Sequence, residues 1–174
     1  MRNKTVRWIT QGAVIAAIYV VLTIFISAFN LASGSIQIRI SEALCILPYF
    51  TAAAVPGLWI GCFLANLITG ASIFDVIFGS LATLLGALGT YALRKHKVLC
   101  TIPPVLSNAV IVPLVLIYAY GIPAVEFHGV NLTYAFNFVT VGIGEVVSVC
   151  VLGSILLRVL EKYRGVLFDD SPES

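Results

Sequence analysis

Charged side chains are scarce in this chain of 174 residues. Aspartate, glutamate, lysine and arginine make up 10% of it, whereas soluble domains average about 25%. Hydrophobic residues make up 60% and come in long uninterrupted runs instead of short alternating segments. Such runs favour membrane helices over a β-barrel. The scarcity of charge therefore argues against an ordinary soluble domain and predicts an all-α membrane protein.

The chain also lacks the sequence motifs of common enzyme classes. It has no His-Glu-x-x-His, no Gly-x-Ser-x-Gly and no Walker-type glycine loop. His96 and His128 fall on opposite predicted sides of the membrane, and no two cysteines form a Cys-x-x-Cys pair. We interpret the four cysteines as small buried hydrophobic residues. We expect no catalytic residues, no metal and no cofactor, so an ATP-driven cycle would need another subunit.

Six apolar stretches predict six transmembrane helices. Their approximate bounds are residues 8–29, 41–55, 57–68, 73–93, 102–120 and 132–160. The second and third have only about 12–15 residues, fewer than the roughly 20 that cross a membrane upright. The break between them is expected before Pro56, because the residue before a proline disfavours helix. Residues 1–164 would form one six-helix membrane domain, and 165–174 an acidic cytoplasmic tail.

The positions of lysine and arginine predict the orientation. Three basic residues precede the first span, three follow the fourth and three follow the sixth. With six spans, all three groups lie on one side, which the positive-inside rule identifies as the cytoplasm. Only Arg39 falls outside. We therefore expect both termini in the cytoplasm.

The last apolar run carries an ionisable residue near its middle. Glu145 lies roughly 13 residues, or about 20 Å, from either end of the run. A charge there costs about 2.5–3.5 kcal/mol on insertion scales and usually faces a cavity or a partner. Asn137, Gly144 and Ser148 share one helical face, with Glu145 at its edge. This pattern predicts a polar surface inside a helix bundle, with Glu145 as its candidate functional residue.

Each of the other polar residues has two possible interpretations, one structural and one functional. Asn66 and Asn108 lie in apolar runs, where amides also serve to join helices. Asp75 either stabilises a helix start or belongs to a site. Arg39, in a connector of alternating polar and apolar residues, either pairs with Glu42 or extends to the lipid headgroups.

The first span contains a small-residue pattern. Ala13 and Ala17 are four residues apart, with Gly12 and Ala16 alongside. Small residues at this spacing let another helix approach closely. That helix would belong either to the same bundle or to a partner.

Several sequence blocks, in this order, resemble the QueT family. They are RISEAL at 39–44, VPGLWIGC at 55–62, DVIFGSLATLL at 75–85, NAVIV at 108–112 and GIGE at 142–145. The likeness extends from about residue 13 to residue 160. Members of this family are S components, the substrate-binding subunits of energy-coupling factor (ECF) transporters.

The resemblance implies a six-helix S component in a bacterial cell membrane. Such a subunit is not an enzyme. It captures a micronutrient from outside and docks on a transmembrane coupling protein that carries two cytoplasmic ATPases. The docking face includes the alanine motif of the first helix, so Ala13 and Ala17 become partner-binding candidates. The implied substrate is a queuosine precursor, a deazaguanine base such as aminomethyl-deazaguanine, or queuine.

The residues suit a guanine-like base. Such a base presents a ring N–H and an exocyclic amine on one edge, and one carboxylate accepts both. Glu145 is the leading candidate for this edge, and Asn108 or Asn137 for the remaining edge. Tyr118 and Tyr134 are candidates for stacking on the ring.

The other candidates belong to the outer part of the chain. An aminomethyl cation would favour a second acid, either Asp75 or Glu42. Gln37 and Arg39, on the outer connector, would close over the bound base.

Two further readings stay open. Relatives often carry glycine and an acid after the NAVIV block, where this chain has Pro113, and the difference leaves room for another flat heterocyclic vitamin. A stand-alone proton-coupled carrier would use Glu145 as its proton site.

Overall fold

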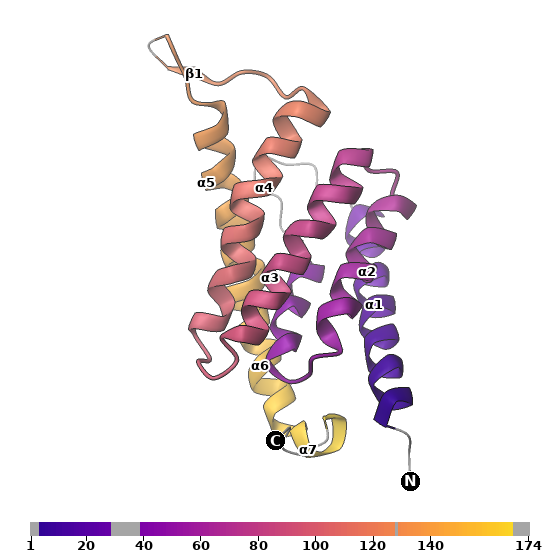
Figure 1. The fold of residues 1–174 in the computed structure, drawn as a ribbon. Coiled ribbons are helices and arrows are strands. Elements are labelled where there is room, and N and C mark those ends of the chain that lie inside the picture. The colour runs from indigo at the N-terminus through magenta and orange to yellow at the C-terminus, as the bar shows by residue number, and fades with distance from the viewer. Residues whose placement is uncertain (1–3, 29–38, 128, 169–174) are drawn as a thin grey trace.

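The computed structural model describes residues 4–28, 39–127 and 129–168. The connector residue Gln37, the basic residue Arg2, His128 and the acidic end of the tail therefore lie outside the described residues. Within them the chain forms a bundle of helices with one short hairpin (Figure 1). The elements are α1 (Lys4–Ala28), η1 (Ile40–Tyr49), α2 (Ala54–Ile68), η2 (Asp75–Gly79), α3 (Ser80–Ala92), η3 (Leu99–Thr101), α4 (Ile102–Tyr120), β1 (Glu126–Phe127), β2 (Val130–Asn131), α5 (Thr133–Glu145), η4 (Val146–Leu152), α6 (Gly153–Lys162) and α7 (Arg164–Leu167).

Four helical segments of the described chain are long and apolar enough to cross a membrane. They are Lys4–Ala28, Asp75–Ala92, Leu99–Tyr120 and Thr133–Lys162. The segments Ile40–Tyr49 and Ala54–Ile68 are apolar but shorter. The expectation of an all-α, multi-pass membrane protein is confirmed at this level. The number of crossings is taken up under the proposed function.

One helix boundary differs from the sequence-based expectation. The break between the two short segments lies at residues 50–53, not before Pro56. Pro56 is instead within the first turn of α2, where its missing N–H has no helical acceptor to lose. Pro48 lies inside η1, which is a 3₁₀-helix of ten residues. Runs of 3₁₀-helix longer than three or four residues are uncommon.

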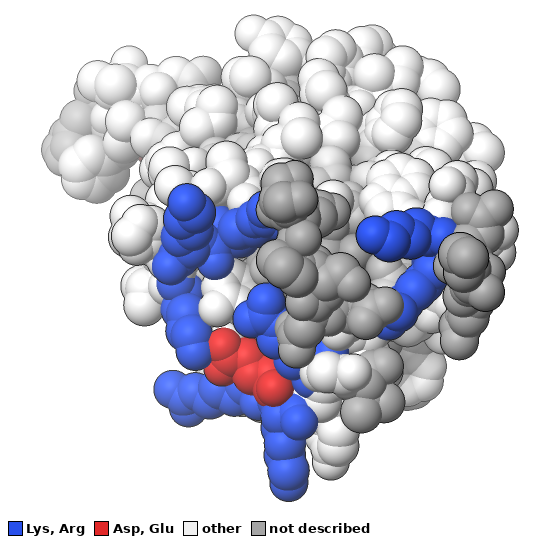
Figure 2. Space-filling model, turned by 60° about the horizontal axis from the view of Figure 1, so that its bottom comes forward, with Lys and Arg blue, Asp and Glu red and all other residues white. Residues whose placement is uncertain are grey.

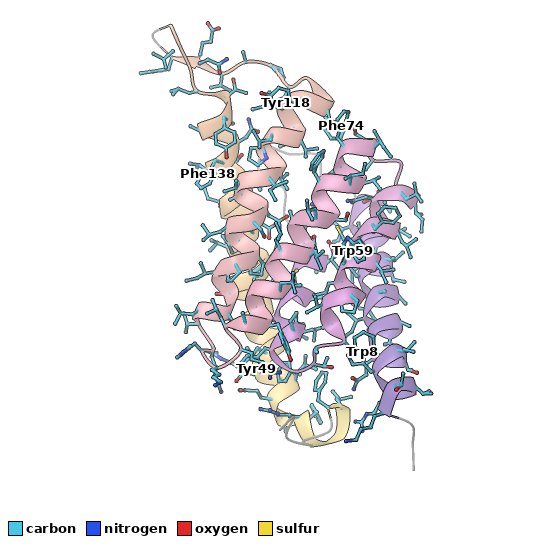
Figure 3. The ribbon with its side chains drawn as sticks, in the orientation of Figure 1. Trp8, Tyr49, Trp59, Phe74, Tyr118 and Phe138 are labelled. Carbon is cyan, nitrogen blue, oxygen red and sulfur yellow. The ribbon has the colours of Figure 1, made fainter. Side chains whose placement is uncertain are left out.

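Side chains are distributed as in a protein surrounded by lipid. Many large apolar residues are exposed, including Val21 at 65% and Leu67 at 55%, while several polar residues are buried inside. Figure 3 shows Trp8 and Tyr49 near one end of the bundle, and Phe74 and Tyr118 near the other. Aromatic residues at both ends are typical of the two membrane–water interfaces.

The two ends of the described chain lie at the same end of the bundle (Figure 1). Gln11, near the start of α1, donates a hydrogen bond to the Leu167 carbonyl over 3.2 Å. The Phe168 ring stacks on Phe50, with centroids 4.9 Å apart. Lysines and arginines gather at this end (Figure 2), where Lys97 forms an ion pair with Glu161 over 2.6 Å. We call it the basic end, and we use the name outer end only for the opposite end of the bundle, which carries the β1–β2 hairpin (Figure 1).

Glycines allow α1 and α2 to pack with their backbones in contact. A Cβ on Gly57 would lie 2.6 Å from the Gly12 carbonyl oxygen. A Cβ on Gly61 would lie 3.0 Å from the Ala16 carbonyl oxygen. Gly12 and Ala16 therefore face the neighbouring helix, while Ala13 and Ala17 are exposed.

Candidate substrate site

A cavity of about 630 Å³ lies at the outer end of the bundle. Its walls come from the later part of α1, the start of η1, the turn after α2, the start of η2 and the end of α4. Small-molecule sites typically measure about 300–1,000 Å³, so the volume suits a ligand of one or two rings. The polar wall residues include Arg39, Ser41, Asn66, Asp75 and Tyr120.

Hydrogen bonds fix Asp75 on this wall. The Asn66 amide donates to the Asp75 carbonyl over 3.1 Å. The Tyr120 hydroxyl donates to the Asp75 carboxylate over 3.4 Å and accepts from the backbone N–H of Ser72 over 3.1 Å. Ser72 also opens the helix, because its carbonyl accepts a hydrogen bond from the backbone N–H of Val76 over 2.9 Å. Asp75 is thus both a helix-start residue and part of the cavity wall.

A second polar layer lies deeper than the cavity. Val112 of α4 lines the cavity, and Asn108 is one helical turn nearer the basic end on the same face. Asn108 is fully buried and Glu145 is 3% exposed. The Asn108 side chain interacts with that of Glu145 and also donates to the Pro104 carbonyl over 3.1 Å. Of the polar surface predicted around Glu145, Gly144 and Ser148 are buried as expected, whereas Asn137 is only half-buried.

Three atoms of this layer are buried without a hydrogen-bond partner among the described residues. They are Glu145 Oε2, Asn108 Oδ1 and Ser148 Oγ. Leaving a buried polar atom unpaired costs about 1–3 kcal/mol, and more for a charged group. Unpaired buried polar atoms of this kind are expected where a ligand completes the hydrogen bonding of a site.

Glu42 is the second fully buried carboxylate. One oxygen accepts a hydrogen bond from the Tyr19 hydroxyl, and the other from the Cys45 thiol over 3.0 Å. Glu42 also acts electrostatically on Glu145. Two carboxylates are thus held near each other in the interior, from η1 and from the end of α5.

The cysteines contribute more than apolar volume. Cys45, Cys62 and Cys100 are buried and unpaired, as expected. The Cys62 sulfur, however, accepts hydrogen bonds from Thr83 over 3.3 Å and from Asn66 over 3.7 Å. Like Cys45 beside Glu42, it belongs to the polar interior.

Each acid of the site coincides with an irregular helical segment. Glu42 lies in the 3₁₀-helix η1, Asp75 begins the π-helix η2, and Glu145 directly precedes the π-helix η4. Single π-helical turns within α-helices are frequent at functional sites. The irregular segments therefore coincide with the two buried acids, Glu42 and Glu145, and with Asp75 on the cavity wall.

Other predicted site residues lie away from this centre. Asn137 is half-buried and donates to the Thr133 carbonyl of its own helix over 2.7 Å. Tyr134 donates to the Val110 carbonyl over 3.2 Å, and Tyr118 is 81% exposed. None of the three is among the residues that line the cavity.

Sequence reasoning missed Tyr19, Ser41 and Tyr120 as parts of the site. Tyr19 is one aromatic residue in a 25-residue apolar helix and carries no local signal. Tyr120 sits at the end of α4, where tyrosine also marks the membrane interface. Ser41 lies between Arg39 and Glu42 in the sequence, and this position was the one indication that it belongs to the site.

Apolar helices with exposed hydrophobic surfaces enclose a polar cavity and, deeper inside, unpaired polar atoms. These features define a multi-pass α-helical membrane protein with an internal polar site. The family model described as "QueT transporter" matches residues 9–162, and the chain therefore belongs to the QueT transporter family.

A curated relative covers part of the chain. It is the queuosine precursor transporter QueT of Lactococcus lactis subsp. cremoris (strain MG1363), 36% identical over 97 residues. The aligned region is 55% of this chain and 56% of the relative, so the chain spans about half the length of the curated protein that it matches. No solved structure matches the chain.

Proposed function

We propose that this chain is the substrate-binding S component of an ECF-type transporter that imports a queuosine precursor into a bacterial cell. The substrate would be a deazaguanine base such as aminomethyl-deazaguanine, or queuine. The observation that carries the proposal is the set of unpaired buried atoms, Glu145 Oε2 and Asn108 Oδ1, beneath a cavity of suitable size. The family membership and the printed substrate of the relative support it.

The roles follow from hydrogen-bonding capacity. A carboxylate offers two acceptor oxygens, which match the paired N–H groups of a guanine-like edge. Glu145 would read that edge, while Asn108 reads the neighbouring edge of the base. Arg39 and Asp75, on the cavity wall, would contact the outer side of the ligand.

The topology proposed for this role has six crossings and both termini in the cytoplasm. Residues 1–164 would then form one membrane domain. The four long segments and the two short ones supply six helical stretches. The ends of the described chain at one end of the bundle, together with the basic residues there, support an even number of crossings (Figures 1 and 2).

A direct binding measurement tests the proposal. Purified protein in detergent should bind at least one deazaguanine base saturably in calorimetry, with no nucleotide and no ion gradient. Flat heterocyclic vitamins of other kinds serve as matched competitors. A flat trace for every deazaguanine base would contradict the proposed substrate. Saturable binding of a competitor alone would show that the substrate belongs to the competitor's class of heterocycles. Uptake that needs a proton gradient and no ATPase partner would favour a stand-alone carrier.

A further inference from the structure

Tyr120 contacts both the cavity and the surroundings of the protein. It is one of the residues that line the cavity, and it is nevertheless 48% exposed. Ser41, on another part of the same cavity wall, is 3% exposed. A residue that reaches the cavity and the surface at once lies at the rim of the opening. Tyr120 therefore marks the place where the outer end of the cavity meets the surroundings.

The Tyr120 hydroxyl connects two segments that are far apart in the sequence. It accepts a hydrogen bond from the backbone N–H of Ser72 over 3.1 Å and donates one to the Asp75 carboxylate over 3.4 Å. Ser72 belongs to the turn between α2 and η2, whereas Tyr120 is the last residue of α4. Both hydrogen bonds are exposed, so water competes for the same groups and the bonds break readily.

Each of the two joined segments has a glycine beside the contact. Gly70 is two residues before Ser72 and has a φ of +72°, and Gly121 directly follows Tyr120 with a φ of +56°. Glycine adopts these left-handed conformations, and others, at little steric cost. A Cβ on either glycine would meet no atom within 4 Å, so the backbone has room to rotate there. Hinges of moving segments are typically a few such loop or helix-end positions.

We propose that Tyr120, Ser72 and Asp75 form a gate at the outer end of the cavity. In the closed state the phenol hydroxyl holds the turn after α2 against the end of α4. When its two hydrogen bonds break, rotation at Gly70 and Gly121 separates the segments and admits the ligand. The inference rests on the proposed function for the identity of the ligand only. Tyr120 is then a positioning residue that controls how fast the ligand enters and leaves.

A thiol inside the cavity tests the gate without any ligand. Ser41→Cys places the thiol on the buried wall, and its reaction with N-ethylmaleimide in the purified protein reports how often the cavity opens. Tyr120→Phe keeps the ring and removes the hydroxyl, so we expect it to raise this labelling rate about threefold to tenfold, the scale of a lost hydrogen bond. Tyr163→Phe removes the same hydroxyl after α6 and should leave the rate unchanged. The protein without Ser41→Cys gives the background of the four native cysteines.

Two results of the labelling experiment would overturn the gate. One is an equal rate with and without the Tyr120 hydroxyl in variants that thermal unfolding shows to be folded. The other needs no change at Tyr120, and so remains decisive should Tyr120→Phe not fold. We expect Ser41→Cys to react at least roughly tenfold more slowly than Glu126→Cys on the exposed hairpin, because an open state of about 0.1–10% population limits the reaction. Equal rates at the two positions would mean that the cavity stands open.

Binding kinetics separate a gate from a direct ligand contact. With aminomethyl-deazaguanine as the probe in stopped-flow measurements, we expect Tyr120→Phe to raise the association and dissociation rate constants by a similar factor. The Kd should stay nearly the same, because a gate changes the barrier and not the two end states. Faster dissociation alone would make Tyr120 a ligand contact and overturn its role in the gate. Absence of binding to the wild type would contradict the proposed substrate, while the labelling experiment still decides on the gate.

Discussion

Asn108 and Glu145 lie at one level of the bundle because each is the same number of residues from the outer end of its helix. Asn108 precedes the end of α4 at Tyr120 by 12 residues, and Glu145 follows the start of α5 at Thr133 by 12 residues. At 1.5 Å per residue, both lie about 18 Å from the outer end. Two antiparallel helices thereby bring an amide and a carboxylate together in the interior.

Neutralising Glu145 tests its role in binding. Glu145→Gln replaces one acceptor oxygen by an amide that would oppose the N–H groups of the base. We expect affinity for a deazaguanine base to fall by roughly tenfold to a hundredfold, the scale of a lost charged hydrogen bond of about 1.5–3 kcal/mol. Calorimetry measures the affinity, and thermal unfolding shows whether the fold is kept.

Ser107→Ala is a suitable companion variant. Ser107 precedes Asn108 and donates to the Pro104 carbonyl within its own helix over 3.1 Å. The affinity of the Ser107→Ala variant for the base should match that of the wild type. If Glu145→Gln also bound like the wild type, Glu145 would have no place in the site.

At the scale of elements, the sequence predicted continuous helices better than irregular ones. The expected bounds of residues 102–120 coincide with α4, and the last apolar run coincides with α5, η4 and α6 within a few residues. Apolar length is enough to define such helices. The 3₁₀-helix η1 and the two π-helices depend on packing against several neighbours, so no local pattern identifies them.

The same limit applies to the site. Glu145 and Asn108 lie within apolar runs of the sequence, and this position correctly predicted that both are buried inside the bundle. The partnership between Tyr19 and Glu42 joins residues 23 apart in the sequence and could not be read from spacing. Gln37 lies outside the described residues, so its expected place over the ligand stays a prediction.

The exposed face of α1 provides a test of partner docking. Ala13→Trp or Ala17→Trp adds bulk on the exposed face without entering the contact between α1 and α2, which Gly12 and Ala16 form. We expect the variants to bind substrate normally and to lose co-purification with the proposed coupling protein and ATPases, because a docked helix needs small residues there. Affinity purification of the co-expressed complex measures the loss.

Ile18→Trp is the matched control. Ile18 is 44% exposed and points to a different side of α1, about 100° from Ala17. It should leave the complex intact. Recovery of the full complex with Ala13→Trp and Ala17→Trp would remove the docking assignment.

For the whole molecule, the basic end predicts the orientation in the cell. Val98 is 78% exposed near the basic end, and Glu126 is exposed in the hairpin at the outer end. We expect Glu126→Cys to react with a membrane-impermeant maleimide in intact cells, and Val98→Cys only after permeabilisation. The wild-type chain gives the background labelling of its four own cysteines. The reverse labelling pattern would mean that the cavity opens toward the cytoplasm in the resting protein.

The contact of Gly12 with Gly57 has a mechanical consequence. With no side chain between the two backbones, α1 and α2 pack in direct contact. Ala13 and Ala17 lie on the exposed face of α1, and Asn66, near the end of α2, lines the cavity. We therefore expect a partner that displaces α1 to displace α2 with it, and so to change the shape of the cavity wall.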